Sequence, residues 1–433
     1  MVAGPGSSGY GGRVVSPGPP VGMSDPTDDQ PHASRPAPPA PDPAPTALND
    51  DPPASIEAPA AIDAYTSASE VALPRERDWG KVAGKVASGI AALFLFVLSL
   101  QLMKDGAAEL APTMRDSALF GNGAATLGAG WLGAYLVLSG SPIAAVALGL
   151  FAGGAITELQ TFTMLTGSRL GASFVVLLVG FLYAVRNRAA NRQEAVGMGV
   201  LALSLTAIVY LPGMVLGYWI LRSGLLEGIS WQTSGDVASV VDLVWGPAQR
   251  LIGGIVPGWA LLPIGLGIVL LSFKLVDRVL PQVSGSSFTG DRARRLKRPW
   301  PMFLLGCTVA TLTLSVSVAL TVLVPLASRG YVKREESIPY IMGANITTLA
   351  DTLLAAMLLR NAVAVQIVLA QAIGVAIVSI LYIALLYGPI KRGVIGLNDR
   401  LVASSARLWV FVVGLFVFPA LLLTSGLWLG SGG

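Results

Sequence analysis

The chain has 433 residues, of which 53% are hydrophobic and 12% charged, and its formal net charge is +4. This composition is too apolar for a soluble globular protein and indicates a membrane protein. The only cysteine is Cys307, which excludes an intramolecular disulfide and a zinc site built on cysteines. The only histidine, His32, lies before the first apolar stretch, so a histidine proton relay within the membrane is also excluded.

The first segment, residues 1–74, differs in composition from the rest. It holds 16 of the 29 prolines and a charge of −7, which leaves +11 on the remaining chain. Such a segment buries too little apolar surface to offset its ordering entropy, so we predict a disordered cytoplasmic tail. It lacks the basic-then-apolar order of a signal peptide. A passive tail and an arm that binds an unknown partner both remain open.

Nine apolar stretches follow the tail. They lie at 86–103, 122–152, 170–185, 196–221, 250–273, 300–326, 338–359, 362–388 and 408–428. A helix needs about 20 residues to cross the hydrocarbon of a bilayer. The stretches 122–152 and 300–326 are rich in Gly, Ser and Thr and contain Pro142 and Pro325, which favours broken or re-entrant helical hairpins over simple spans. The predicted fold class is an all-α polytopic membrane protein.

Clusters of Lys and Arg predict the direction of these stretches. They lie at 75–85, 186–192, 292–298 and 391–407. Basic residues accumulate on the cytoplasmic side, whereas 222–250 mixes acidic and basic residues and is expected outside. The resulting division is a tail at 1–74, a first transmembrane repeat at 75–222, an extracellular loop at 223–249, a second repeat at 250–400 and a C-terminal membrane helix at 401–433.

Two short polar motifs recur with an offset of 176 residues. The Ser-Gly-Ser triplet at 139–141 corresponds to Ser-Val-Ser at 315–317, and 167–171 corresponds to 343–347. Under the orientation above, the two halves run in opposite directions and form inverted-topology repeats. Paired polar interruptions of apolar segments are the best sequence indication of a transporter's binding site. No nucleophile–histidine pair or nucleotide-binding motif indicates an enzyme, and nothing indicates a nucleic-acid partner.

Residues 343–348, Gly-Ala-Asn-Ile-Thr-Thr, resemble the Gly-Ala-Asn-Ile-Gly-Thr-Thr signature of the sodium/phosphate cotransporter family. The opening helix, 93–106, resembles the first helix of that family. The two Ser-x-Ser triplets stand where family members have Gln-Ser-Ser-Ser, with Leu138 and Leu314 in place of the glutamines. In the first repeat, Arg169 replaces the signature asparagine. The chain is therefore identified as a divergent bacterial member.

The resemblance implies a secondary active transporter in the bacterial inner membrane, with its N-terminus in the cytoplasm. It would carry inorganic phosphate with sodium by alternating access around a midplane site between the repeats. Two alternatives remain open: transport of another small anion coupled to protons, and a degenerate transporter fold that acts as a membrane scaffold. Sodium is the only cofactor expected. Membrane lipid is an expected partner, and homodimerisation remains open.

A phosphate ion requires hydroxyl donors, backbone N–H groups at helix starts and one or two cationic groups. The predicted substrate-binding residues are Ser139, Ser141, Arg169, Ser315 and Ser317. The predicted cation-binding residues, in and beyond the signature, are Asn345, Thr347, Thr348 and Asp351.

Two of these residues carry charge within apolar surroundings. Arg169 would attract an anion, form an ion pair with Glu158 or Asp351, or lie at the outer interface. Asp351 would bind sodium or a proton, or form a salt bridge with Arg169. Glu158 and Gln160 are expected on a surface loop, and Arg360 is expected to reach the membrane interface.

Overall fold

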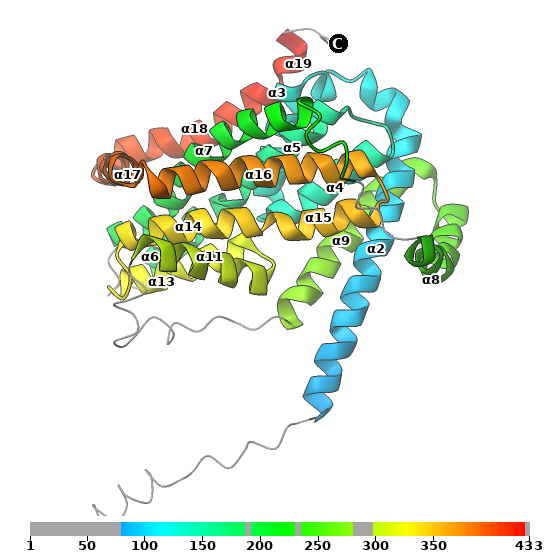
Figure 1. Ribbon diagram of the computed structural model, residues 1–433, viewed down its shortest axis with the longest axis horizontal. Helices are drawn as coiled ribbons and strands as arrows, with labels where there is room; N and C mark the ends of the chain where they lie inside the picture. Colours follow the sequence, from blue (N-terminus) through cyan, green and yellow to red (C-terminus); the bar gives the residue numbers. More distant parts are fainter. Residues whose placement is uncertain (1–78, 187–191, 230–234, 280–297, 429–433) are drawn as a thin grey trace, which may run out of the picture. The chain divides into compact units, whose positions relative to one another are not determined.

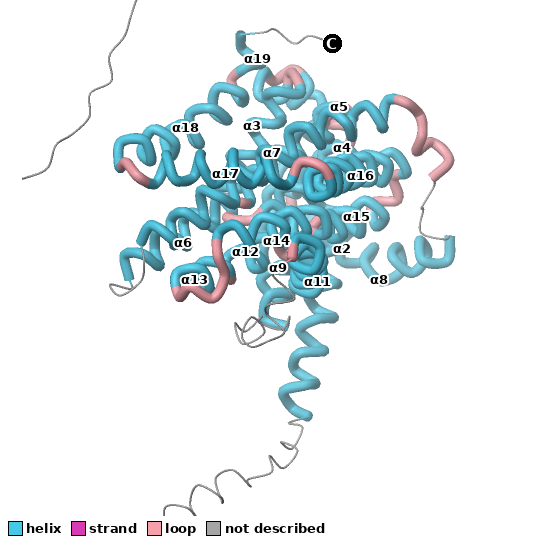
Figure 2. The backbone as a smooth tube through the Cα atoms, turned by 60° about the vertical axis from the view of Figure 1, so that its left-hand side comes forward, coloured by secondary structure: helices cyan, strands magenta, loops and turns pink. Residues whose placement is uncertain are grey.

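The computed structural model describes residues 79–186, 192–229, 235–279 and 298–428. Within these ranges all regular elements are helices (Figures 1 and 2). The predicted disordered tail at 1–74 and most of the basic cluster at 292–298 lie outside the described residues. The chain divides into the units Met1–Arg75 and Glu76–Gly433, and everything below concerns the second unit.

The helices of the first half are α2 (Trp79–Arg115), η1 (Ala118–Phe120), α3 (Gly123–Val137), α4 (Gly140–Ala152), α5 (Glu158–Ala172), α6 (Phe174–Arg186) and α7 (Arg192–Arg222). Those that follow are α8 (Gly235–Ile255), α9 (Gly258–Val279), α11 (Pro299–Thr313), α12 (Val316–Thr321), α13 (Leu323–Ser328), α14 (Arg334–Thr347), α15 (Leu349–Leu358), α16 (Ala362–Ala384), α17 (Tyr387–Val402), α18 (Ser405–Leu423) and α19 (Ser425–Trp428).

In the described part of the chain, seven helical segments are long and apolar enough to cross a membrane. They are Ala83–Arg115, Glu158–Arg186, Gln193–Arg222, Gly258–Val279, Arg334–Leu358, Ala362–Ala384 and Ser405–Leu427. The predicted all-α, multi-pass class is therefore confirmed. The other apolar helices are too short to cross a bilayer: Gly123–Val137, Ser141–Ala152, Pro299–Thr313 and Val316–Ser328.

Both Gly- and Ser-rich stretches are broken at their Ser-x-Ser triplets. The chain turns at Leu138 and Leu314, which have φ angles of 56° and 46°. Ser139 and Ser315 then begin the next helices in extended conformations. A left-handed leucine is unfavourable because its Cβ crowds the following carbonyl. The surrounding packing therefore holds both turns, and a two-helix hairpin forms in each half.

Helix boundaries recur with the same offset as the polar motifs. α3 and α11 are both 15 residues long and start 176 positions apart, at Gly123 and Pro299. α4 and α12 start at Gly140 and Val316, again 176 positions apart. The same spacing relates α5 and α14. The opposite orientation of the halves across a membrane, and the re-entrant character of the hairpins, stay predictions.

Each hairpin packs on the following helix through a pair of glycines. α3 crosses α5 at Gly130 and Gly167, where a Cβ on Gly167 would lie 2.1 Å from the Leu127 carbonyl oxygen. α11 crosses α14 at Gly306 and Gly343, which stand 176 positions after the first pair. Small residues at such crossings let helix backbones approach closely, as is typical of membrane helices.

Cys307 lies at the second glycine crossing. Its Sγ donates to the Gly343 carbonyl oxygen at 3.5 Å, and the side chain is partly exposed. The thiol therefore marks the closest approach of α11 and α14.

Helices of the two halves pack against each other. α2 lies along α9, and α7 packs on both α14 and α16 (Figures 1 and 2). One buried cluster joins Leu170 of α5 to Ile341 of α14, and another joins Phe162 of α5 to Ile367 of α16. The core is thus shared between the halves.

The expected extracellular loop at 223–249 contains most of a helix, α8. Its apolar residues recur every three or four positions. Trp245 stacks on Phe94 of α2, and Ile252 belongs to the same hydrophobic cluster. This period is that of an amphipathic helix. Arg360, expected at the membrane interface, forms an ion pair with Asp242 of α8 at 3.1 Å.

Candidate functional site

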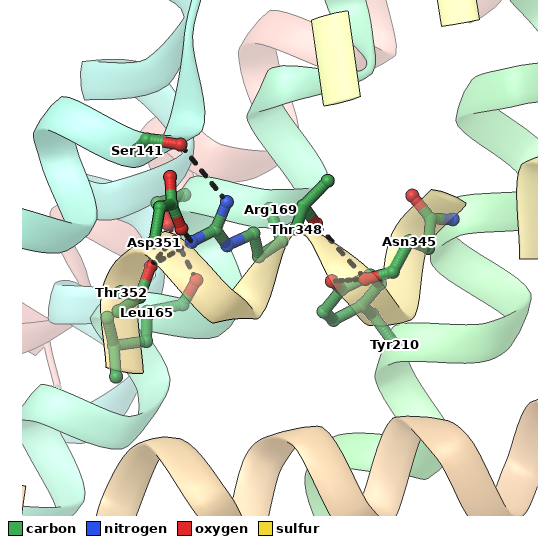
Figure 3. A network of polar contacts seen from close by, with 9 residues as sticks. Ser141, Leu165, Arg169, Tyr210, Asn345, Thr348, Asp351 and Thr352 are labelled. Atoms are coloured by element: carbon green, nitrogen blue, oxygen red, sulfur yellow. Dashed lines mark hydrogen bonds and ion pairs between the residues drawn. The ribbon is translucent and has the colours of Figure 1, made fainter. Parts of the chain in front are cut away.

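Arg169 and Asp351 form a buried charged pair where the two halves meet (Figure 3). The residues are 3% and 8% exposed. The Arg169 guanidinium, on α5, donates from Nη2 to Asp351 Oδ1 at 3.4 Å and from Nη1 to Ser141 Oγ at 3.5 Å. Nη2 also donates to Thr352 Oγ1. Of the partners expected for Arg169, the structure selects Asp351; Glu158 instead begins α5.

The pair is incompletely satisfied. Arg169 Nε and Asp351 Oδ2 are buried atoms without a hydrogen-bond partner among the described residues. Buried polar atoms in folded proteins nearly always have partners, so each such atom calls for an explanation. Unpaired atoms on a cation and on its anionic partner suit a site that exchanges partners.

Helix starts surround this pair. Ser141 lies in the first turn of α4, and Asp351 lies in the first turn of α15. The first N–H groups of a helix lack intrahelical partners and carry partial positive charge. The start of α15 therefore favours the Asp351 carboxylate, and the start of α4 favours an anion next to Arg169.

The four predicted serines have different roles. Ser141 contacts Arg169 as described. Ser317 Oγ donates to the Leu138 carbonyl oxygen at 3.4 Å, which connects the break of one hairpin to that of the other. Ser315 Oγ accepts from Val318 N–H and caps α12, whereas Ser139 begins α4 without a side-chain capping bond. The structure thus brings Ser141, Arg169 and Asp351 together, whereas Ser139, Ser315 and Ser317, all within the described residues, have no hydrogen bond to Arg169.

The predicted cation residues before Asp351 form a separate cluster. Asn345 Nδ2 donates to Thr206 Oγ1 of α7 at 3.1 Å, and Tyr210 donates to the Asn345 carbonyl oxygen at 2.7 Å. The Thr348 hydroxyl donates to the same carbonyl at 3.2 Å, and the Thr347 hydroxyl to the Cys307 carbonyl. Figure 3 shows the Arg169 guanidinium pointing toward Ser141 and Asp351, away from Asn345.

Three residues of the site were missed from the sequence: Thr206, Tyr210 and Thr352. Thr206 and Tyr210 lie in an apolar helix outside both motifs, so no pattern marks them. Thr352 directly follows Asp351, and its hydroxyl donates to Asp351 Oδ1 at 2.9 Å. A hydroxyl beside an acidic residue in an apolar helix was the only available signal.

Tyr210→Phe tests the link between α7 and the signature. It removes the donor to the Asn345 carbonyl, and we expect a loss of about 1–2 kcal/mol in unfolding free energy because a buried bond is lost. Thermal unfolding in detergent would measure it. Tyr331→Phe, at an exposed position, is the matched control and should leave the midpoint unchanged; equal midpoints for both variants would contradict the assignment.

A polar cavity of about 460 Å³ lies at the start of α14. Arg334 pairs there with Glu194 of α7 at 2.9 Å and with Asp399 of α17 at 2.8 Å. Lys391 of α17 pairs with Glu335, and this carboxylate raises the pKa of the Lys391 ammonium group. These pairs fasten α17 to the start of α14.

Residues 268–398 match the family model described as Na+/Pi-cotransporter. The similarity to the Na+/Pi-cotransporter family thus covers the second part of the chain. The matched segment contains the break at 315–317, the signature at 343–348 and Asp351. Ser139, Ser141 and Arg169 lie before it. No curated protein and no solved structure matches the chain.

This match confirms the resemblance found in the sequence over residues 268–398. The Na+/Pi-cotransporter family is a family of transporters and not of enzymes, and the seven apolar helical segments agree with a multi-pass membrane transporter. The bacterial origin and the cytoplasmic N-terminus stay predictions. The roles of the individual site residues are taken up below as proposals.

Proposed function

We propose that the chain is a secondary active transporter that carries inorganic phosphate together with sodium by alternating access. The buried Arg169 guanidinium beside the broken hairpin is the single observation that carries this proposal. A cation buried at membrane depth is costly and is retained for function. The match of residues 268–398 to the Na+/Pi-cotransporter family supports the choice of phosphate as substrate and of sodium as coupling ion.

Phosphate would bind to Arg169 from the side of Ser141. A guanidinium donates hydrogen bonds to phosphate oxygens, and the unpaired Nε and the long contact from Nη1 leave two of its donor groups available. The α4 start would add backbone N–H groups and the Ser139 and Ser141 hydroxyls. Ser315 and Ser317 would contribute from the opposite hairpin.

Sodium would bind where α14 gives way to α15. Hard cations prefer oxygen ligands. The unpaired Asp351 Oδ2, the Thr347 and Thr348 hydroxyls and carbonyl oxygens freed at the helix break supply them. Asn345 would act by positioning the helix break, since its side chain is bonded to Thr206 and its carbonyl oxygen accepts from Tyr210 and Thr348.

Alternating access would use the two hairpins as moving parts. The recurrence of helix boundaries at 176 residues, and the two glycine crossings with the same spacing, support two repeats of one structural unit. Inverted repeats that rock around a midplane site are a recurrent transporter architecture.

Uptake of radiolabelled phosphate into liposomes tests the proposal. We expect saturable uptake that requires an inward sodium gradient. Ser141→Ala should lower uptake about tenfold, since a hydrogen bond to a charged group contributes about 1.5–3 kcal/mol. Thr308→Ala removes an exposed hydroxyl that bonds only within α11 and should retain full uptake.

Other outcomes point to the alternatives. Arg169 in place of the signature asparagine, with leucines in place of both glutamines, favours a second candidate, a transporter of another small anion. Proton-driven flux of such an anion without phosphate flux would establish it. If no anion shows saturable flux, the membrane scaffold is the alternative that remains.

A further inference from the structure

We infer that Asp351 couples the two ions by exchanging partners. In the empty site it neutralises Arg169; a bound anion takes its place, and the released carboxylate then holds one sodium ion. This inference rests on the proposed function and adds to it the residue that makes transport of either ion depend on the other.

The first observation is how loosely the pair is held. Arg169 meets Asp351 through one carboxylate oxygen at 3.4 Å. The exposed pair of Arg360 and Asp242 is bidentate, at 3.1 and 3.2 Å, and Arg334 meets Asp399 at 2.8 Å. A buried ion pair offsets its desolvation only with close geometry and full hydrogen bonding. The buried pair has the poorest geometry of the three, which indicates a contact built to be released.

The second observation is the distribution of partners around the guanidinium. Asp351 and Thr352 lie against Nη2, whereas Nη1 is engaged only by Ser141 at 3.5 Å and Nε is unpaired. An anion that approaches from the side of Ser141 therefore meets Nη1 first. The parallel second hydrogen bond must come from Nη2, so the anion completes its contact by displacing Asp351.

The third observation is that Thr352 bonds both members of the pair. It accepts from Arg169 and donates to Asp351 Oδ1. When the anion takes the guanidinium, this second bond stays and keeps the carboxylate in place. The orphaned Oδ2 of Asp351 then faces the cation as its charged ligand.

Charge balance makes the exchange obligatory. With the site empty, the buried charges of Arg169 and Asp351 cancel. An anion alone on Arg169 would leave the Asp351 carboxylate buried and uncompensated, and a cation alone would leave Asp351 overcompensated beside Arg169. Binding of each ion therefore strengthens binding of the other by the same factor. Because Arg169 belongs to α5 and Asp351 to α15, the exchange also changes the contact between the halves.

Phosphate binding to the purified protein, measured by calorimetry in sodium chloride and in choline chloride, tests the inference. We expect sodium to tighten phosphate binding to the natural protein at least tenfold. Asp351→Asn should bind phosphate with equal Kd in both salts and at least as tightly as the natural protein in sodium. Asp242→Asn removes an exposed carboxylate and should keep the full effect of sodium.

The outcomes separate this inference from the proposed function. If the natural protein binds phosphate with sodium dependence and Asp351→Asn keeps that dependence, the inference is overturned and the function stands. If the natural protein binds no phosphate in either salt, the inference and the proposed function are both overturned. If Asp351→Asn fails to fold, Asp351→Glu is measured in its place. The sodium concentration that gives a half-maximal effect on phosphate binding should then shift more than fivefold. An unchanged sodium concentration would overturn the inference.

Discussion

Replacement of Arg169 by glutamine is expected to abolish phosphate uptake and to destabilise the protein by about 3–5 kcal/mol. Both effects follow from burial. The substitution removes the only cation that contacts Asp351 within the described residues and leaves its carboxylate buried without compensation. Uptake should fail because the remaining donors, the serine hydroxyls and the α4 start, lack a full positive charge for a phosphate anion.

The double variant Arg169→Gln/Asp351→Asn separates the two effects. It removes both charges, so thermal unfolding in detergent should show most of the lost stability restored while uptake stays absent. Arg392→Gln, at an exposed position on α17, is the matched control and should change neither. If the double variant is no more stable than Arg169→Gln alone, the loss of stability does not come from the unpaired Asp351 carboxylate. If Arg169→Gln still takes up phosphate, Arg169 is not part of the anion site.

Replacement of Gly167 by alanine should destabilise the protein by about 3 kcal/mol or more, with the same result for Gly343. A Cβ at either position would lie 2.1 Å from a backbone carbonyl oxygen of the crossing helix, Leu127 or Phe303. Backbone atoms cannot move aside as a side chain can, so the helices must separate, and overpacking of this kind costs about 1–3 kcal/mol and sometimes more. The change would also shift Arg169, two residues after Gly167.

Gly414→Ala is the control for this prediction. Its position on α18 has no atom within 4 Å of an added Cβ, and alanine favours a helix over glycine by about 1 kcal/mol. Thermal unfolding should thus show an unchanged or higher midpoint for Gly414→Ala and a much lower one for the crossing glycines. Equal midpoints for all three would contradict the close crossings.

Local pattern predicted the hairpins and their breaks. Glycine, serine and proline interrupt the apolar stretches at 122–152 and 300–326, and the structure breaks both at the Ser-x-Ser triplets. The 176-residue offset relates the helix boundaries as well as the motifs, because both are set by the local sequence. α8 was missed for a different reason: its mixed charges suggested a loop, although its apolar residues recur with a helical period.

Contacts between the halves could not be predicted in the same way. Arg169 and Asp351 are 182 positions apart, and the sequence left Glu158 and Asp351 open as partners. Glu158 is closer along the chain but begins α5, three turns from Arg169 on the same helix. Asn345 was expected at a cation site, yet its amide is bonded to Thr206, a residue that no motif marks.

The place of Cys307 offers a native probe for the alternating access proposed above. It is the only thiol in the chain and touches the Gly343 carbonyl where α11 crosses α14. A fluorophore or spin label attached there needs no engineered cysteine and meets no competing one. Since the second hairpin cannot move against the signature helix without changing this crossing, the environment of one natural sulfur atom records each opening and closing of that half of the site.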